Sequence, residues 1–209
     1  MIEVVTWETA HLFGDALADQ YRFRYRQFVE RDGWDVPNYR QMEYDQFDTP
    51  AAVYLLWRDS ALRVRGMVRL IPTSRPYMLS QLWDFLAPPD GLPSCDEVWE
   101  NTRFAVDRTL PPHLRKQVMG ELVLASLEFG LEHGVASYLL VSPLWILRGS
   151  LTAAGLEHDI LNTTDRLGPR AVAVARVEVS SRILGQSRQA LGVAASVITP
   201  APELERLAA

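Results

Sequence analysis

The chain has 209 residues, a formal net charge of −5 and 48% hydrophobic residues, values that are typical of one globular domain, here residues 1–209. The negative charge argues against a general nucleic-acid or anionic-membrane binder. A single cysteine, Cys95, excludes an internal disulfide framework, and four scattered histidines lack metal-ligand spacing. No leader-like or membrane-spanning apolar run is recognisable, so we expect a cytoplasmic enzyme or binding protein.

The first half of the chain predicts a strand, a helix, a loop and a hairpin. Alternating residues at 2–6 are typical of a strand, and residues 11–31 fit an amphipathic helix with acidic residues early and arginines late. Residues 33–48 form a long loop rich in aromatic and acidic side chains, and such loops are usually functional. Residues 52–58 and 62–71 predict two strands joined by a tight turn.

The second half alternates strands with helices. We expect a short helix at 78–86, a central strand at 98–107, a long helix at 111–134, a strand at 138–141, a helix at 143–155, a strand at 171–179 and a helix at 180–191. This order predicts an α/β (α+β) fold with a mixed central sheet flanked by helices. It is compatible with the acyltransferase sandwich of the GNAT type.

The central stretch, residues 98–107, carries two charges inside an apolar strand. Glu100 and Arg103 are either a structural ion pair at a strand end or functional groups, because unpaired charges are rarely buried. Three positions apart, they lie on opposite faces of an ideal strand. A bulge is therefore needed for both to line one site, and bulges are common near active sites.

The chain resembles the LuxI-type acyl-homoserine-lactone synthases, bacterial quorum-sensing signal makers. The likeness runs from about residue 20 to 108, and beyond that only the helix–strand–helix pattern continues. One departure is Asn101-Thr102, where the family usually has an apolar residue and serine. The residues that carry the likeness are Arg24, Phe28, Trp34, Glu43-Tyr44-Asp45-Gln46-Phe47-Asp48, Gly66, Arg69-Leu70-Ile71-Pro72-Thr73, Leu79, Phe85 and Trp99-Glu100-Asn101-Thr102-Arg103-Phe104.

The resemblance implies an acyltransferase with two substrates and no metal or redox cofactor. S-adenosylmethionine supplies the homoserine lactone and an acyl thioester, on coenzyme A or acyl carrier protein, supplies the acyl group; methylthioadenosine is released. The amine of S-adenosylmethionine must lose a proton before it attacks the thioester, and Glu100 is the first candidate for the acceptor. Arg103 and Asp45 are the other candidate catalytic residues.

For the S-adenosylmethionine site, the resemblance implies seven residues: Arg24, Phe28, Trp34, Asp45, Asp48, Arg69 and Arg103. Trp34 and Phe28 offer ring faces for adenine stacking or cation–π contact, although Phe28 also fits a core position. Asp45 and Asp48 either bind the cationic substrate or are solvated turn residues. Arg24 and Arg69 are expected to hold the acidic loop closed by charge-assisted bonds.

For the acyl thioester, the candidates are Phe85, Phe104, Ala105, Val106, Ser142 and Trp145. Backbone N–H groups at Phe104 to Val106 are candidate donors to the thioester oxyanion. Trp145 either faces the core or closes an acyl tunnel; closure favours a short, branched or aromatic acyl group such as isovaleryl. Because few basic residues remain outside the assigned arginines, an acidic carrier protein has little to dock on, which favours acyl-coenzyme A.

Two other functions remain open at this point. A GNAT-type N-acetyltransferase on another amine usually has a glycine-rich loop before its long helix, and residues 108–115 contain no glycine, although Arg115 and Lys116 remain candidate phosphate ligands. A non-catalytic S-adenosylmethionine-binding sensor would bind without releasing methylthioadenosine. The presence of Glu100 with the acidic pair argues against it.

Overall fold

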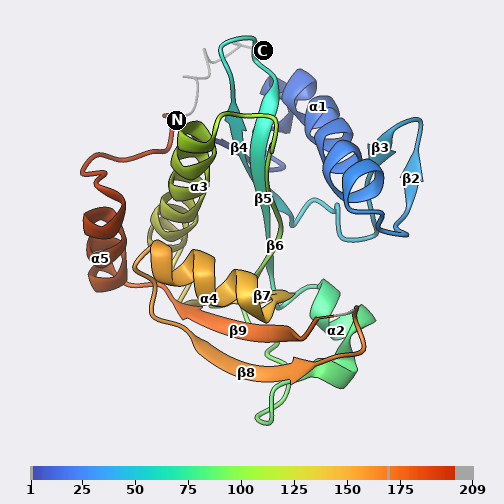
Figure 1. The fold of residues 1–209 in the computed structure, drawn as a ribbon, viewed down its shortest axis with the longest axis vertical. Coiled ribbons are helices and arrows are strands. Elements are labelled where there is room, and N and C mark those ends of the chain that lie inside the picture. The colour runs from blue at the N-terminus through green and yellow to red at the C-terminus, as the bar shows by residue number, and fades with distance from the viewer. Residues whose placement is uncertain (1, 169, 201–209) are drawn as a thin grey trace, which may run out of the picture.

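A computed structural model describes residues 2–168 and 170–200 (Figure 1). They form a seven-stranded mixed sheet in the order β1-β4-β5-β6-β7-β9-β8 and a small two-stranded sheet, β2-β3. The strands are β1 (Ile2–Val5), β2 (Asn38–Tyr39), β3 (Met42–Glu43), β4 (Val53–Arg58), β5 (Val64–Pro72), β6 (Val98–Val106), β7 (Ser137–Pro143), β8 (Asp159–Thr164) and β9 (Val172–Glu178). The predicted mixed sheet flanked by helices is confirmed.

Helices cover both faces of this sheet (Figure 1). The α-helices are α1 (Gly14–Arg24), α2 (Met78–Leu82), α3 (Pro112–Glu132), α4 (Leu144–Ala153) and α5 (Ser181–Leu191), with short turns η1 (Ala10–Leu12), η2 (Tyr25–Arg31) and η3 (Asp84–Leu86). The predicted helix at 11–31 is divided, because η2 is a π-helix that continues α1. No helix within the described ranges has the length and apolar character needed to span a membrane.

Two apolar clusters lie on the two faces of the sheet. One cluster contains Leu122 of α3 and Leu147 of α4, and the other contains Phe23 of α1 and Leu79 of α2. Helix α3 approaches β5 closely because position 66 is glycine: a Cβ atom there would lie 2.4 Å from Cγ1 of Val118. The long helix is thereby fixed directly behind the central strands.

The central strand β6 changes partners partway along its length. It is antiparallel to β5 throughout, and its parallel ladder with β7 ends at the pair Asn101 and Leu140. Beyond that pair, β6 continues to Val106 beside β5 while β7 continues to Pro143 beside β9. Beyond this point, the facing edges of β6 and β7 are no longer paired with each other.

The bulge that the Glu100–Arg103 spacing requires is present. Thr102 pairs with Arg69 and Ala105 pairs with Met67, so two residues of β6 face the single residue between them on β5. Arg103 takes a φ of 54°, a left-handed conformation that costs a non-glycine residue on the order of 1–3 kcal/mol. The bulge turns the Arg103 side chain to the face that carries the predicted site.

Candidate active site

Six charged side chains meet beside β5 and β6, and all are nearly or fully buried. Three are arginines and three are carboxylates, so their formal charges balance. They are Arg24 of α1, Arg69 of β5, Arg103 of β6, Glu43 of β3, and Asp45 and Asp48 of the following loop. Five of the six were predicted from the sequence as substrate-binding residues, and the structure brings them together.

Asp48 joins the helix α1 side of the cluster to β5. Its Oδ1 atom accepts hydrogen bonds from Nη1 of Arg24 at 2.7 Å, Nη1 of Arg69 at 2.9 Å and the Tyr54 hydroxyl at 2.8 Å. Burial opposes ionisation of Asp48, but the guanidinium groups of Arg24 and Arg69 outweigh it and lower the pKa of this carboxyl. Asp48 is therefore a permanently charged anchor for the two arginines.

Asp45 and Glu43 hold Arg103 in place. Nη2 of Arg103 lies 2.7 Å from Oδ2 of Asp45 and 2.9 Å from Oε1 of Glu43. Asp45 also accepts a 2.7 Å bond from Nη1 of Arg69, and Glu43 accepts one from Nε of Arg24. The predicted closure of the acidic loop by Arg24 and Arg69 is confirmed in these contacts, with Arg103 as a third clamp.

Glu100 lies on β6, and its fully buried side chain points to the start of α2. Its two carboxylate oxygens accept the backbone N–H groups of Met78 at 2.9 Å and Leu79 at 2.8 Å. Burial raises the pKa of Glu100 to about 7, although these two bonds and the charges of Arg69 and Arg103 lower it in part. A carboxyl with this pKa can exchange a proton near neutral pH, as a general base must.

Met78 links Glu100 to the charge cluster. Its sulfur lies 3.3 Å from Nη2 of Arg69 and 3.3 Å from Nη1 of Arg103, so the thioether is placed between two guanidinium groups. Glu100 and Arg103 therefore share one neighbourhood without forming a direct ion pair. The interpretation of these two residues as a simple structural pair is wrong.

Two aromatic rings cover Arg103. Phe28 and Trp34 are stacked with centroids 4.6 Å apart, and Cζ of Arg103 lies 5.6 Å and 5.9 Å from their ring centres. Phe28 is 4% exposed whereas Trp34 is 45% exposed. Phe28 thus supports the arrangement from inside, and Trp34 leaves ring surface for a planar or cationic ligand.

The predicted thioester-binding residues are less concentrated. Phe104, Ala105 and Val106 lie on the part of β6 beyond the β6–β7 ladder, and Ser142 lies on the corresponding part of β7. Phe85 lies on a separate element, η3, where the guanidinium of Arg166 is 5.4 Å from its ring centre.

Trp145 does not occupy the predicted position. It is 54% exposed at the start of α4, and its ring contacts the guanidinium of Arg170 at 5.3 Å. Its α4 neighbours Leu147 and Leu151 are the buried side chains of this helix. This exposure contradicts the interpretation as a core-facing residue and argues against a tunnel plug, a role that stays a prediction.

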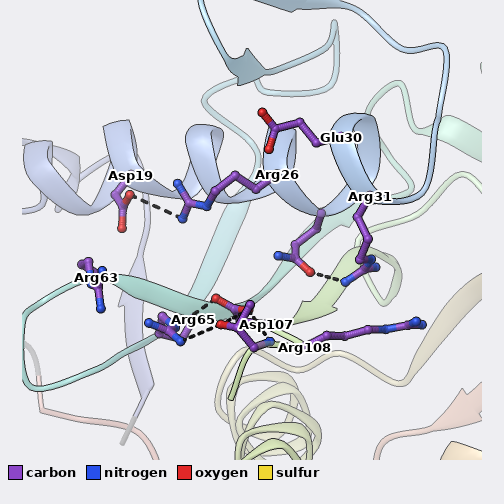
Figure 2. Close-up of a pocket in the computed structure, with 10 residues that line it drawn as sticks. Asp19, Arg26, Glu30, Arg31, Arg63, Arg65, Asp107 and Arg108 are labelled. Carbon is purple, nitrogen blue, oxygen red and sulfur yellow. Dashed lines mark hydrogen bonds and ion pairs between the residues drawn. The ribbon is translucent and has the colours of Figure 1, made fainter. Parts of the chain in front are cut away.

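A second group of arginines lies outside the charge cluster. Figure 2 shows it around a pocket of about 580 Å³ between α1, η2, the start of β5 and the end of β6. The charged residues that line it are Arg26, Arg31, Arg63, Arg65, Arg108, Asp19, Glu30 and Asp107. The expectation that few basic residues remain outside the assigned arginines is wrong for this region.

The arginines of this pocket differ in how far they are neutralised. Arg65 is bound by Asp107 at 3.0 Å, whereas Nη2 of Arg26 reaches Asp19 only at 3.9 Å. Within residues 2–168 and 170–200, the Arg108 side chain makes no hydrogen bond or ion pair. Arg108 lies two residues after the end of β6 and leaves a positive charge there.

Sequence reasoning assigned no role to three contact residues of the site. Glu43 belongs to the same acidic motif as Asp45, and its position two residues before Asp45 is the sequence feature that could have indicated its role. Tyr54 reads as an ordinary strand residue and Met78 as an apolar helix residue. Tyr54 contacts Asp48, six positions away in the sequence, and Met78 contacts Arg103, 25 positions away. No local sequence pattern reveals such contacts.

Comparisons with known proteins agree with this geometry. The model of the autoinducer synthase family matches residues 10–185. An acyl-homoserine-lactone synthase of Acinetobacter nosocomialis is 32% identical over 69% of this chain and 82% of its own length. An isovaleryl-homoserine lactone synthase of Bradyrhizobium diazoefficiens is 29% identical over 100% of this chain and 93% of its own.

The fold agrees as well. The structure of BjaI, described as a coenzyme A-dependent acyl-homoserine lactone synthase with S-adenosylmethionine and isopentyl-coenzyme A, has a TM-score of 0.86 and 28% identity, covering 98% of this chain and 95% of that one. The predicted GNAT-like acyltransferase sandwich is confirmed.

Proposed function

The chain belongs to the autoinducer synthase family and is an acyl-homoserine-lactone synthase, and from this premise we propose that it acylates S-adenosylmethionine with a short, branched acyl group taken from coenzyme A. The observation that carries the proposal is the neutral, buried cluster beside Glu100, a carboxyl with a pKa of about 7. We place S-adenosylmethionine against this cluster and the thioester along the free edge of β6.

Two substitutions make the product. In one, the substrate amine loses a proton and its nitrogen attacks the thioester carbon; a C–N bond forms, the C–S bond breaks and the thiol leaves with a proton. In the other, the substrate carboxylate attacks the carbon beside the sulfonium; a C–O bond forms, a C–S bond breaks and methylthioadenosine leaves. Neither step passes electrons to an external acceptor, so the proposal includes no redox cofactor.

We assign the proton acceptor role to Glu100, because its carboxyl has a pKa of about 7, whereas the oxygens of Asp45 are bound to the charged guanidinium groups of Arg69 and Arg103. Arg103 and the exposed face of Trp34 are assigned to the substrate. Arg24, Arg69 and Asp48 position the others. The backbone of Phe104 to Val106 is assigned to the thioester oxygen.

Two observations support coenzyme A as the carrier. Two relatives that align over nearly the whole chain are described as an isovaleryl-homoserine lactone synthase and a coenzyme A-dependent synthase. The arginine pocket also lies where β6 ends, and Arg108 offers an unpaired guanidinium to the phosphates of the donor. Because these substrates belong to cellular metabolism, a cytoplasmic location is part of the proposal.

The test is to incubate the protein with S-adenosylmethionine and matched acyl groups on coenzyme A and on acyl carrier protein, and to identify products by mass. We expect isovaleryl-homoserine lactone and methylthioadenosine with the coenzyme A donor. A preference for long-chain carrier-protein donors would contradict both the carrier and the acyl group. Methylthioadenosine release also separates a synthase from a sensor, and the lactone separates it from another N-acetyltransferase.

The role of Arg108 has its own comparison. Arg108→Ala should raise KM about tenfold for acyl-coenzyme A, the loss of one charge-assisted contact. It should leave KM unchanged for the same acyl group on N-acetylcysteamine, which has no phosphate. Arg182→Ala is the matched control, because Arg182 lies on α5 and pairs with Glu157.

A further inference from the structure

We propose that Asn101 selects an acyl group that carries a hydrogen-bond donor, such as a hydroxyl group. The inference rests on the proposed function, because it concerns the acyl thioester that lies along β6. It starts from one atom: the side-chain oxygen of Asn101 is buried and has no hydrogen-bond partner within the described residues.

The orientation of the Asn101 amide follows from its neighbour. Ser126 of α3 donates its hydroxyl proton to the carbonyl of Leu122 at 2.9 Å, so its oxygen is left as an acceptor. Asn101 must therefore turn its NH₂ group to Ser126, at 3.4 Å, and its carbonyl oxygen away from it. A flipped amide would place two acceptors against each other.

The surroundings of this oxygen are apolar. Asn101 pairs with Leu70 on β5 and with Leu140 on β7, and directly paired residues share a face of the sheet. Asn101 is 9% exposed, so bulk water does not cover its amide. A buried acceptor without a partner costs about 1–3 kcal/mol, and a substrate that donates to it removes that cost.

Asn101 also lies at the correct end of the strand. It forms the last rung of the β6–β7 ladder, whereas the far end of β6 leads to the exposed Arg108. A donor that lies along β6 with its charged carrier at the exposed end directs its acyl tail toward Asn101. Because of the bulge, Asn101 and Ala105 lie opposite Leu70 and Met67, which are three residues apart on β5. Asn101 is therefore roughly 10 Å from Ala105 at about 3.3 Å per residue, so the hydroxyl belongs several bonds beyond the thioester carbon.

The chemical class is therefore a hydroxylated acyl thioester. A site built to bind a hydroxyl discriminates strongly against the analogue that lacks it, because its own polar atom is then left unpaired. An apolar side chain at position 101 would have no such preference.

The experiment compares matched coenzyme A donors with and without a hydroxyl: isovaleryl and 3-hydroxyisovaleryl, hexanoyl and 6-hydroxyhexanoyl, 3-phenylpropanoyl and 3-(4-hydroxyphenyl)propanoyl. For the best-fitting pair we expect kcat/KM to favour the hydroxylated donor by about tenfold or more. Asn101→Leu should abolish or reverse this preference while S-adenosylmethionine binding is kept. Ser126→Ala allows the Asn101 amide to flip and should therefore reduce the preference for the hydroxylated donor.

Ser187→Ala is the matched control, because the Ser187 hydroxyl is also buried without a partner but lies on α5. It should leave the preference unchanged, and an equal effect of this variant would overturn the assignment to Asn101. Equal or better use of every unhydroxylated donor by the wild type would also overturn it. If only carrier-protein donors react, the proposed carrier fails and the same pairs of acyl groups, loaded on carrier protein, decide the role of Asn101.

Discussion

Arg103 and Glu43 form a buried two-bond pair across 60 positions of the chain: Nε and Nη2 of the arginine lie 3.2 Å and 2.9 Å from the two carboxylate oxygens. The pair ties the bulge of β6 to the hairpin of the acidic loop. It therefore fixes the loop against the sheet at the point where the bulge turns a side chain into the site.

Removing either partner should destabilise the fold, because the six-residue cluster, whose charges balance, is left with one buried charge in excess. We expect Glu43→Ala and Arg103→Ala each to lower the free energy of unfolding by about 3–5 kcal/mol. The double variant should cost less than the sum of the two, which urea unfolding of all four proteins measures. Strict additivity would show that the pair contributes little coupling energy.

Strand β6 and its bulge could be predicted from the sequence. Its alternation identified the strand, and the three-residue spacing of Glu100 and Arg103 required an extra residue if both were to face one site. The β2–β3 hairpin could not be predicted in the same way. Its turn residues, Arg40 and Gln41, have φ values of 49° and 61°, positions for which asparagine and glycine are the usual signal.

Glu100→Gln should lower the acylation rate and also destabilise the protein. The carboxylate accepts two backbone N–H groups, whereas glutamine has one acceptor oxygen and turns its NH₂ group to the second N–H, so about 1–3 kcal/mol of stability is lost. We expect the activity loss to remain after correction for the folded fraction, measured by methylthioadenosine release at a temperature where both proteins are folded. Full activity of the folded variant would remove Glu100 from the base role.

The pKa of Glu100 leads us to expect opposite pH dependences for the acylation rate and for the stability of the fold. The acylation rate should fall below about pH 7, where Glu100 becomes protonated, and Glu100→Gln should lack this part of the profile. Stability changes in the other sense, because the pKa of Glu100 in the folded protein lies above 4.5, the ordinary value of a glutamic acid. The contribution of Glu100 to folding is complete below about pH 4.5 and declines as pH rises through about 7, which unfolding midpoints of wild type and variant across this range test.

Trp34→Ala should weaken S-adenosylmethionine binding with little effect on folding, because its ring is 45% exposed although it stacks on Phe28. A loss of about 5- to 30-fold in affinity corresponds to one cation–π or stacking contact of about 1–2 kcal/mol. Calorimetric titration measures it. Trp7→Ala, at a tryptophan that is 65% exposed, is the control, and equal affinities for both variants would make Trp34 a surface residue only.

The direction of the Trp145 side chain could not be predicted from the sequence, for a different physical reason than the β2–β3 hairpin. The sequence placed a large aromatic residue at the start of a helix after an apolar strand, and either direction of the side chain fits that pattern. The direction depends on the helix phase, which Leu147 and Leu151 set by taking the buried positions of α4. Trp145 is left on the solvent side of the same turn.

Trp145→Ala should therefore leave the acyl-chain preference unchanged. The ring is 54% exposed and contacts Arg170, so its removal enlarges no enclosed space and is expected to cost less than about 1 kcal/mol of stability. The measurement is the ratio of kcat/KM values for coenzyme A donors of increasing chain length, in wild type and variant side by side. Leu147→Ala is the comparison that does open the core, because that side chain is 3% exposed. If Trp145→Ala nevertheless gained longer acyl chains, the ring would have to fold inward when the donor binds, and the prediction would be wrong.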